Sequence, residues 1–284
     1  MSKYQNIQWY PGHMFKTMKE LRASLSLVDI VIVLLDARIP ISSLNPQLLE
    51  VVSKKKILYI LNKSDLADKE KTQNFINHFT DQGHAAIHVS SLDAKMPSKV
   101  IKVLDQIMAP FQEKRHEKGL KDKIYKVLVT GIPNVGKSTF INALTKRKAT
   151  KTGNTPGVTK QLQWVRIHPK IELLDSPGVL WPKFEDETVA LNLALTGAIK
   201  DKILPLEEVV YYGITFLHAH YQDVLKSRYD IDDIDSAFHK IALNRGALLK
   251  GGLIDEDRVC HAFLTDLRNH KLGGLTFDIL DVRI

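Results

Sequence analysis

The chain has 284 residues, 44% of them hydrophobic and 25% charged, with a net charge of +8, which is typical of a soluble globular protein with a substantial core. The longest apolar run, residues 30–35, is far shorter than the roughly 18 residues that cross a bilayer, and the N-terminal residues lack the apolar core of a secretion signal. Cys260 is the only cysteine, which excludes an internal disulfide and a cysteine zinc cluster, and we expect a cytoplasmic protein without a membrane segment.

The first part of the chain alternates short apolar runs with amphipathic stretches. Strands are predicted at 27–37, 55–65, 85–91, 124–131, 162–169 and 170–178. Helices are predicted at 72–83, 97–111 and 137–145, and a polar, largely basic connector at 113–123. The first two strands are continuously apolar, which favours a parallel sheet covered on both faces. Such alternation predicts right-handed crossovers and an open α/β sheet with helices on both faces.

The character of the sequence changes after residue 184, where strand signals fade. Apolar residues recur at helical spacing over 189–199, 206–225, 234–244 and 256–269. One stripe contains Leu206, Val209, Val210, Phe216 and Leu217. We expect an α/β domain at 1–184 and a small all-α domain at 185–284. The first carries a net charge of +14 and the second −6, which fits either a polyanionic partner for the first domain or ordinary solvated surfaces.

Residues 131–138, GIPNVGKS, match the phosphate-loop pattern G-x-x-x-x-G-K-[ST] between a predicted strand and a predicted helix. Glycines let the backbone amides turn inward toward a polyphosphate, and the helix adds its positive end. Lys137 would place a charge between the β- and γ-phosphates, and Ser138 would ligate Mg²⁺. A chance match would usually lack the flanking strand and helix. The loop therefore predicts nucleotide binding by Asn134, Val135, Gly136, Lys137, Ser138 and Thr139.

Residues 175–178, DSPG, follow an apolar strand where a second metal-organising carboxylate belongs. Asp175 would act on Mg²⁺, through water, and the Gly178 amide would sense the γ-phosphate. Thr159, in the loop before this strand, would complete the Mg²⁺ shell when GTP is bound. Simple polar turns explain both segments less completely, and for Thr159 that alternative stays open.

Residues 62–65, NKSD, end the second predicted strand and indicate which base is bound. Asp65 can accept hydrogen bonds from the ring N1–H and the exocyclic amine of guanine, a donor pair that adenine lacks. Asn62 can bond the base and brace the phosphate loop, while the stem of Lys63 stacks along the ring plane. The remaining expected contacts are Ser64 in the same loop and Ser90 and Ser91 after the next strand. Together the motifs predict GTP as substrate and GDP as product.

The base-selecting loop precedes the phosphate loop, the reverse of the usual order in guanine-nucleotide switches. A circular permutation explains this order, because a site depends on where strands lie rather than on where the chain begins. The connector at 113–123 is the predicted join. In this arrangement the D-x-x-G segment leads almost directly into the helical domain, so loss of phosphate could move that domain.

In these motifs and in their order, the sequence resembles the circularly permuted GTPases, and within them the ribosome biogenesis GTPase A family. The resemblance covers nearly the whole chain and includes IQWYPGHM at 7–14, DARIP at 36–40, DSPGVLWPKFED at 175–186, LTGAIKD at 195–201 and RGALLKGGLID at 245–255. It implies GTP hydrolysis in a late step of large (50S) ribosomal subunit assembly, stimulated by the particle. It also implies a helical domain that contacts ribosomal RNA, and we expect a monomer.

The resemblance also implies two catalytic details. Many GTPases have Gln after D-x-x-G, but this chain has Val179, and the water-orienting role passes to His13 in the N-terminal loop. Asn134 matches the phosphate-loop Asn of K⁺-activated relatives, in which the cation supplies charge. A loop or core histidine, and hydrogen bonding within the loop, are the simpler alternatives for these two residues.

The net acidic helical domain fits poorly with RNA binding. A local basic patch is expected from Lys240, Arg245, Lys250, Arg258, Arg268 and Lys271. Lysines at 54–56 and the basic run at 146–151 could carry more of the phosphate contact.

Three other functions remain open at this point. A permuted GTPase of the small subunit is disfavoured by the single cysteine and the helical tail, and a P-loop kinase or ATPase is disfavoured by NKSD. A nucleotide-gated RNA-binding module, in which hydrolysis is incidental, is the third.

Overall fold

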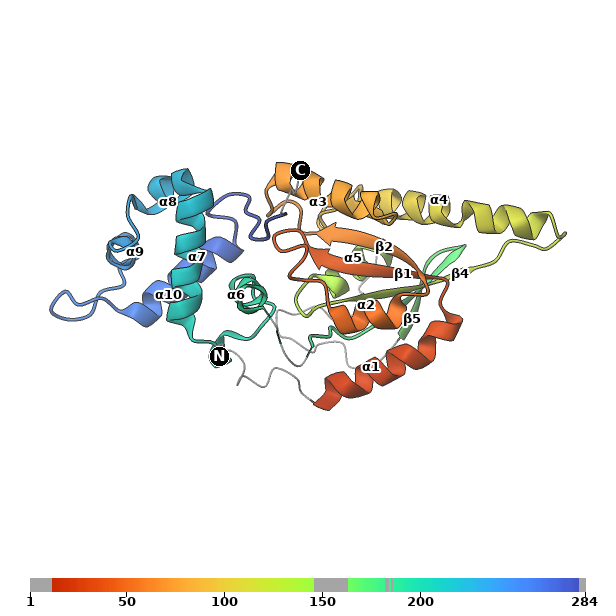
Figure 1. Cartoon of the computed structure of the whole chain (residues 1–284), viewed down its shortest axis with the longest axis horizontal. Coiled ribbons are helices and arrows are strands. Elements are labelled where there is room, and N and C mark those ends of the chain that lie inside the picture. The colour runs from red at the N-terminus through yellow and green to blue at the C-terminus, as the bar shows by residue number, and fades with distance from the viewer. Residues whose placement is uncertain (1–11, 146–162, 182–183, 185, 281–284) are drawn as a thin grey trace.

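The computed structural model describes residues 12–145, 163–181, 184 and 186–280, without the side chains of residues 12–17 and 163. Two domains lie next to each other along the longest axis (Figure 1). One contains the sheet and its covering helices, and the other contains helices alone, as the sequence predicts.

The sheet has six strands in the order β3-β2-β1-β4-β6-β5. Their bounds are β1 (Ile30–Asp36), β2 (Lys56–Asn62), β3 (Ala85–His88), β4 (Tyr125–Gly131), β5 (Gln163–His168) and β6 (Ile171–Asp175). Every pair is parallel except β5 and β6. The half of the sheet that carries the base-selecting loop joins the half that carries the phosphate loop where β1 pairs with β4. The carboxyl ends of β2 and β4 therefore flank that of β1.

Helices cover both faces of this sheet: α1 (Gly12–Ser24), α2 (Pro46–Val52), α3 (Lys69–Asp81), α4 (Met96–His116) and α5 (Lys137–Thr145). Alternate residues of β1 belong to two apolar clusters. Ile32 packs in the cluster that contains residues of α4 and α5, whereas Val33 packs with residues of α1, α2 and α3. This two-sided burial explains why the strand is apolar throughout.

The sequence prediction of this domain was wrong in one place and incomplete in two. The predicted connector at 113–123 is helical as far as His116, because α4 continues past Pro110. The Gln112 side chain forms two hydrogen bonds with the backbone of Lys123, so the segment that follows α4 is bonded to the helix. Helices α1 and α2 were not predicted, although Asn45 caps α2 and Pro46 begins it, a recognisable start signal.

The second domain contains α6 (Glu187–Leu195), α7 (Leu206–His220), α8 (Gln222–Tyr229), α9 (Ala237–Arg245) and α10 (Glu256–Arg268). The helix predicted over 206–225 breaks at Tyr221, whose backbone is not helical. The Tyr221 hydroxyl donates to Asp68 of the sheet domain at 3.2 Å and accepts from the backbone of Thr276 at 3.2 Å. The hydrogen bond to Asp68 crosses the domain boundary, and it explains why the local helical pattern is interrupted at Tyr221. Among the described residues, no helix is both long and apolar enough to cross a membrane.

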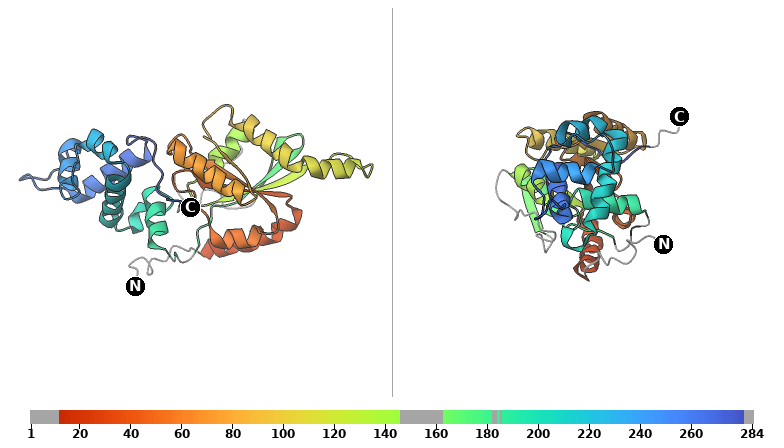
Figure 2. Two further views of the ribbon diagram at one scale, coloured as in Figure 1. Left: turned by 45° about the horizontal axis from the view of Figure 1, so that its top comes forward. Right: turned by 90° about the vertical axis from the view of Figure 1, so that its left-hand side faces the viewer.

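The segment after α10 returns to the sheet domain (Figure 2). The Leu275 amide donates to the Leu66 carbonyl, and the Phe277 amide donates to the Arg38 carbonyl. One buried carboxylate, Asp278, closes the junction. It accepts from the backbone amides of residues 41 and 42, from the Ser42 hydroxyl and from Asn192 of α6. Asn192 also donates to the Ser42 hydroxyl at 3.1 Å, so the helical domain is bonded to the sheet domain at both of its ends.

Candidate nucleotide-binding site

The phosphate loop connects β4 to α5 and is packed tightly against the other motifs. A Cβ atom at Gly136 would lie 2.5 Å from the Asn62 side chain, and one at Gly178 would lie 2.8 Å from the Pro133 backbone. The glycines at these positions therefore allow both the base-selecting loop and the D-x-x-G segment to contact the phosphate loop.

Lys137 begins α5 and is 7% exposed. Burial lowers the pKa of Lys137, while the nearby carboxylate of Asp175 acts in the opposite direction. A buried cation at the start of a helix is a favourable place for a phosphate group. Ser138 and Thr139 follow it, both half-buried, in the first turn of the same helix.

Asn62 joins the three loops that the sequence assigns to the site. Its amide nitrogen donates to the Val135 carbonyl in the phosphate loop at 2.8 Å. Its amide oxygen accepts from the hydroxyl of Ser91 at 2.7 Å and from the backbone amide of Ser91 at 3.2 Å. The predicted bracing of the phosphate loop is therefore present in the structure.

Lys63 adds a second link between the base-selecting and phosphate loops. It has a left-handed backbone, and its ammonium group donates to the Asn134 carbonyl at 2.6 Å and to Asp36 at 2.9 Å. Burial acts to raise the pKa of Asp36, but Arg38 and Lys63 outweigh it and hold that pKa well below the usual range. Asp36 thus stays ionised and fixes the position of the lysine stem.

Asp36 and Arg38 were not identified as site residues from the sequence. Both are buried, and Arg38 donates from two nitrogens to the Asp36 carboxylate at 2.9 and 2.7 Å. The available signal was an apolar strand that ends abruptly in D-A-R, since charges at the end of a buried strand must be paired.

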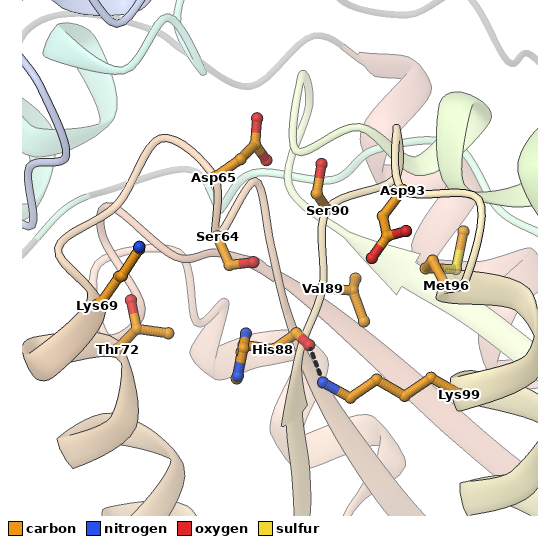
Figure 3. Close-up of a pocket in the computed structure, with 10 residues that line it drawn as sticks. All are labelled: Ser64, Asp65, Lys69, Thr72, His88, Val89, Ser90, Asp93, Met96 and Lys99. Atoms are coloured by element: carbon orange, nitrogen blue, oxygen red, sulfur yellow. Dashed lines mark hydrogen bonds between the residues drawn. The ribbon is translucent and has the colours of Figure 1, made fainter.

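Asp65 and Ser90 lie together beside a pocket of about 370 Å³ at the ends of β2 and β3. Figure 3 shows their side chains directed to the same side of this pocket, away from His88 and Lys99. Asp65 is exposed, and the backbone amide of Ser64 before it donates to the Val89 carbonyl. A carboxylate held on an ordered loop and exposed to solvent is suited to accept hydrogen bonds from a base.

The D-x-x-G segment continues from β6 into the core. Asp175 is 1% exposed, and the Ser176 hydroxyl donates to the Val129 carbonyl at 2.9 Å. Val179 is also 1% exposed, and its backbone bonds both Gly131 and Asn45. The position that often holds a catalytic glutamine is therefore a core position in this chain.

The structure does not describe the side chains of two residues predicted to be catalytic, His13 and Thr159. Thr159 is not among the described residues, and His13 is placed only by its backbone, in the first turn of α1.

Half of the cations in the basic patch predicted in the helical domain contact carboxylates. Arg245 forms an ion pair with Asp266 at 3.4 Å. Lys240 contacts the carboxylates of Asp230 and Asp232, and Arg268 pairs with Asp201 at 2.8 Å. The other three members, Lys250, Arg258 and Lys271, are exposed. The pairing of the first three could not be predicted, because composition does not show which charges are paired.

Comparison with known proteins identifies the family. A family model described as "50S ribosome-binding GTPase" matches residues 126–241, starting in the strand that leads to the phosphate loop. The ribosome biogenesis GTPase A of Bacillus pumilus is 45% identical over 276 residues, which cover 96% of this chain and 98% of that protein. The chain belongs to the ribosome biogenesis GTPase A family.

Other family members and solved structures are similar over almost as much of the chain. The probable ribosome biogenesis GTPase A of Mycoplasma pneumoniae is 32% identical, covering 96% of each chain. The GNP-bound YlqF from T. maritima has a TM-score of 0.64 at 26% identity, covering 93% of this chain and 97% of that one. The protein is accordingly a GTP hydrolase of ribosome biogenesis, with a circularly permuted GTPase domain and an all-α domain after it.

Proposed function

We propose that the protein hydrolyses GTP to GDP and phosphate in a late step of 50S subunit assembly, and that the ribosomal particle stimulates this activity. The buried position of Val179 carries the proposal. The loops assigned to phosphate binding lie together, but Val179, the residue after Gly178, is buried and has no polar side chain to orient water. Such a site binds GTP and turns it over slowly until another group completes it.

The residues around Lys137 fit a magnesium ion. Among the described residues, no three His, Cys, Asp or Glu side chains gather in a group that could hold a metal. Mg²⁺ in nucleotide sites usually takes one or two protein oxygens and completes its shell with phosphates and water. Asp175 and Ser138 would supply those oxygens, and Thr159 would add a third in the GTP state. The ion would supply charge to the β- and γ-phosphates.

Asn134 remains the proposed ligand for K⁺. Its amide nitrogen donates to the Gly197 carbonyl at 2.7 Å, which places its amide oxygen on the opposite side of the group. An oxygen held in this way would suit a monovalent cation beside the phosphates. We also propose that His13 orients the attacking water, by approaching from α1.

The proposed partners are the 50S subunit and its RNA. The domain at 1–184 carries the net positive charge, and Lys54 and Lys56 are exposed on it, while Lys55 bonds the Val28 carbonyl. Exposed basic residues are therefore present on both domains, and the net positive charge of the GTPase domain favours it as the larger phosphate contact. We propose that the helical domain, taken as residues 185–284, also contacts the RNA. We further propose that the whole protein is monomeric and acts in the cytoplasm.

The proposal is tested by measuring GTP hydrolysis with purified 50S or 30S subunits, in K⁺ and then in Na⁺. We expect 50S subunits to raise the rate at least tenfold in K⁺, and 30S subunits to leave it unchanged. Equal stimulation by both subunits, or by neither, would contradict the assignment to the large subunit. A smaller 50S-stimulated rate in Na⁺ would support the K⁺ site, and equal rates would refute it.

His13→Ala tests the water-orienting role in the same assay. We expect the 50S-stimulated rate to fall about 100-fold, the usual range for one acid–base group, with GTP affinity nearly unchanged. His116→Ala is a suitable control, because His116 is exposed at the far end of α4. An unaltered stimulated rate would exclude His13.

A further inference from the structure

The end of α6 presents four consecutive backbone carbonyls, of residues 194–197, which we call the carbonyl row. The last carbonyls of a helix have no partner within the helix and need one elsewhere. The Ala194 carbonyl accepts locally from the Gly197 amide at 3.1 Å. Arg268 of α10 adds a bond to the Ala194 carbonyl at 2.8 Å and one to the Leu195 carbonyl at 3.0 Å. The same guanidinium pairs with Asp201, so Arg268 is bonded both to the row and to the segment that follows it.

The other two carbonyls of the row are bonded from the GTPase domain. Arg38 donates to the Thr196 carbonyl at 3.2 Å, and Asn134 donates to the Gly197 carbonyl at 2.7 Å. A Cβ atom at Gly197 would lie 3.3 Å from Arg268, so the α10 arginine packs directly on the residue that Asn134 contacts. One short segment thus touches both α10 and the phosphate loop.

Both GTPase-domain donors are also tied to the base-selecting lysine. Asn134 has a left-handed backbone, and its carbonyl accepts from Lys63 at 2.6 Å. Arg38 bonds the same buried carboxylate, Asp36, that Lys63 contacts. A change in the loops around the nucleotide would therefore alter both bonds to the carbonyl row.

We propose that Asn134 is a positioning residue through which the carbonyl row couples the phosphate loop to α10. A hydrogen bond weakens steeply when its donor angle falls below about 120°, so a nucleotide-dependent movement of the loop that turns the Asn134 amide away from the Gly197 carbonyl changes how the row is held. Coupling between two sites is reciprocal. Contacts of α10 with the row consequently change the relative affinity of the site for GDP and GTP. This coupling requires nucleotide binding alone and no ribosomal particle.

Arg268→Ala in the full-length protein tests the coupling. Dissociation constants for GDP and for a non-hydrolysable GTP analogue would be measured by titration of fluorescent nucleotides. We expect the ratio of the two constants to change about fivefold or more, the usual lower bound for coupled sites. The matched control is Arg228→Ala, which removes a two-nitrogen contact with Asp266 inside the helical domain without touching the row. Its ratio should stay within about twofold of the unmodified protein.

Arg268→Lys serves if the alanine variant does not fold, because lysine retains the charge that pairs with Asp201 but lacks the guanidinium fork. An unchanged ratio in the folded Arg268 variant, or an equal change in the Arg228 control, would overturn the proposal.

A double variant shows whether Asn134 is the route. In an Asn134→Ala background, whatever its own affinity, Arg268→Ala should leave the GDP-to-analogue ratio unchanged, because the bond that transmits its effect is already absent. If the two changes multiplied instead, the row would affect the nucleotide by another path and Asn134 would not be the positioning residue.

Discussion

Two buried charges, Lys137 in the GTPase domain and Asp266 in the helical domain, have different surroundings. In the GTPase domain, Lys137 is enclosed at the start of a helix with its pKa lowered by burial, a cation suited to a bound anion. In the helical domain, Asp266 is as deeply buried but is fully engaged by its own neighbours. It accepts two hydrogen bonds from Arg228 and one from Tyr229, and Arg245 lies 3.4 Å away.

This difference separates ligand binding from stability. A charge that is left for a ligand costs folding free energy and is compensated when the ligand binds, whereas a charge that is paired internally stabilises the fold alone. Substitutions at the first kind of residue should change nucleotide binding or hydrolysis, and substitutions at the second kind should change the free energy of unfolding.

The largest effect is expected for Lys137→Ala. Loss of a preorganised charge at the phosphates typically lowers the rate by two to three orders of magnitude, and we expect about a 1000-fold loss of 50S-stimulated GTP hydrolysis. Lys102→Ala, on the exposed side of α4, should retain full activity. Substantial hydrolysis by the Lys137 variant, measured as phosphate release, would show that this buried charge is not reserved for the substrate.

Asp65→Asn should change the base that is bound. The asparagine amide complements the exocyclic oxygen of xanthine but not the amine of guanine, so GDP affinity should fall about 100-fold and xanthosine diphosphate affinity should rise. Asp93→Asn provides the control, since Asp93 lines the same pocket from the loop after β3. If competition titrations showed that the Asp65 variant still prefers GDP, Asp65 would not be the residue that reads the base.

Asp266→Ala should reduce stability and leave the nucleotide untouched. Its removal strands the Tyr229 hydroxyl and two arginines that are about one-third exposed, so we expect a loss of about 2 kcal/mol in the free energy of unfolding. Asp257→Ala, an exposed change in the same helix, should have almost no effect. Chemical denaturation gives the free energies, and a GDP titration checks binding. A large loss of GDP affinity would contradict the separation of roles.

The smallest effect concerns RNA contact. Lys54→Glu with Lys56→Glu should weaken 50S binding about tenfold at moderate ionic strength and reduce the slope of affinity against salt concentration. The paired change Lys250→Glu with Lys271→Glu, in the helical domain, should weaken it less. The reverse ranking in co-sedimentation would place the main phosphate contact on the helical domain.

The sheet and the convergence of motifs could be predicted because each depends on local patterns. The continuously apolar run before Asp36 predicted a strand buried on both faces, and GIPNVGKS predicted the turn into α5. The motif order predicted the permutation, which the strand order and the family comparison confirm.

The remaining features depend on contacts between distant parts of the chain. The sequence near Tyr221 does not indicate that a helix ends there and that the tyrosine bonds Asp68. The sequence near Asn134 likewise does not indicate its bond to Gly197. The same reason explains why the pairing within the basic patch was not predicted, because the partner of Arg245 lies in another helix. The positions proposed for GTP, Mg²⁺ and K⁺ remain predictions on this framework.

The most direct test measures hydrolysis of xanthosine triphosphate by the Asp65→Asn variant, with and without purified 50S subunits. It tests base selection by residue 65 and stimulation by the 50S subunit in one assay. GTPases that contaminate ribosome preparations act on GTP, so turnover of the altered nucleotide reports on this protein. The account predicts 50S-stimulated release of phosphate from xanthosine triphosphate and little from GTP. Stimulated hydrolysis of GTP with none of xanthosine triphosphate would mean that the loops at 62–65 and 131–138 do not hold one nucleotide.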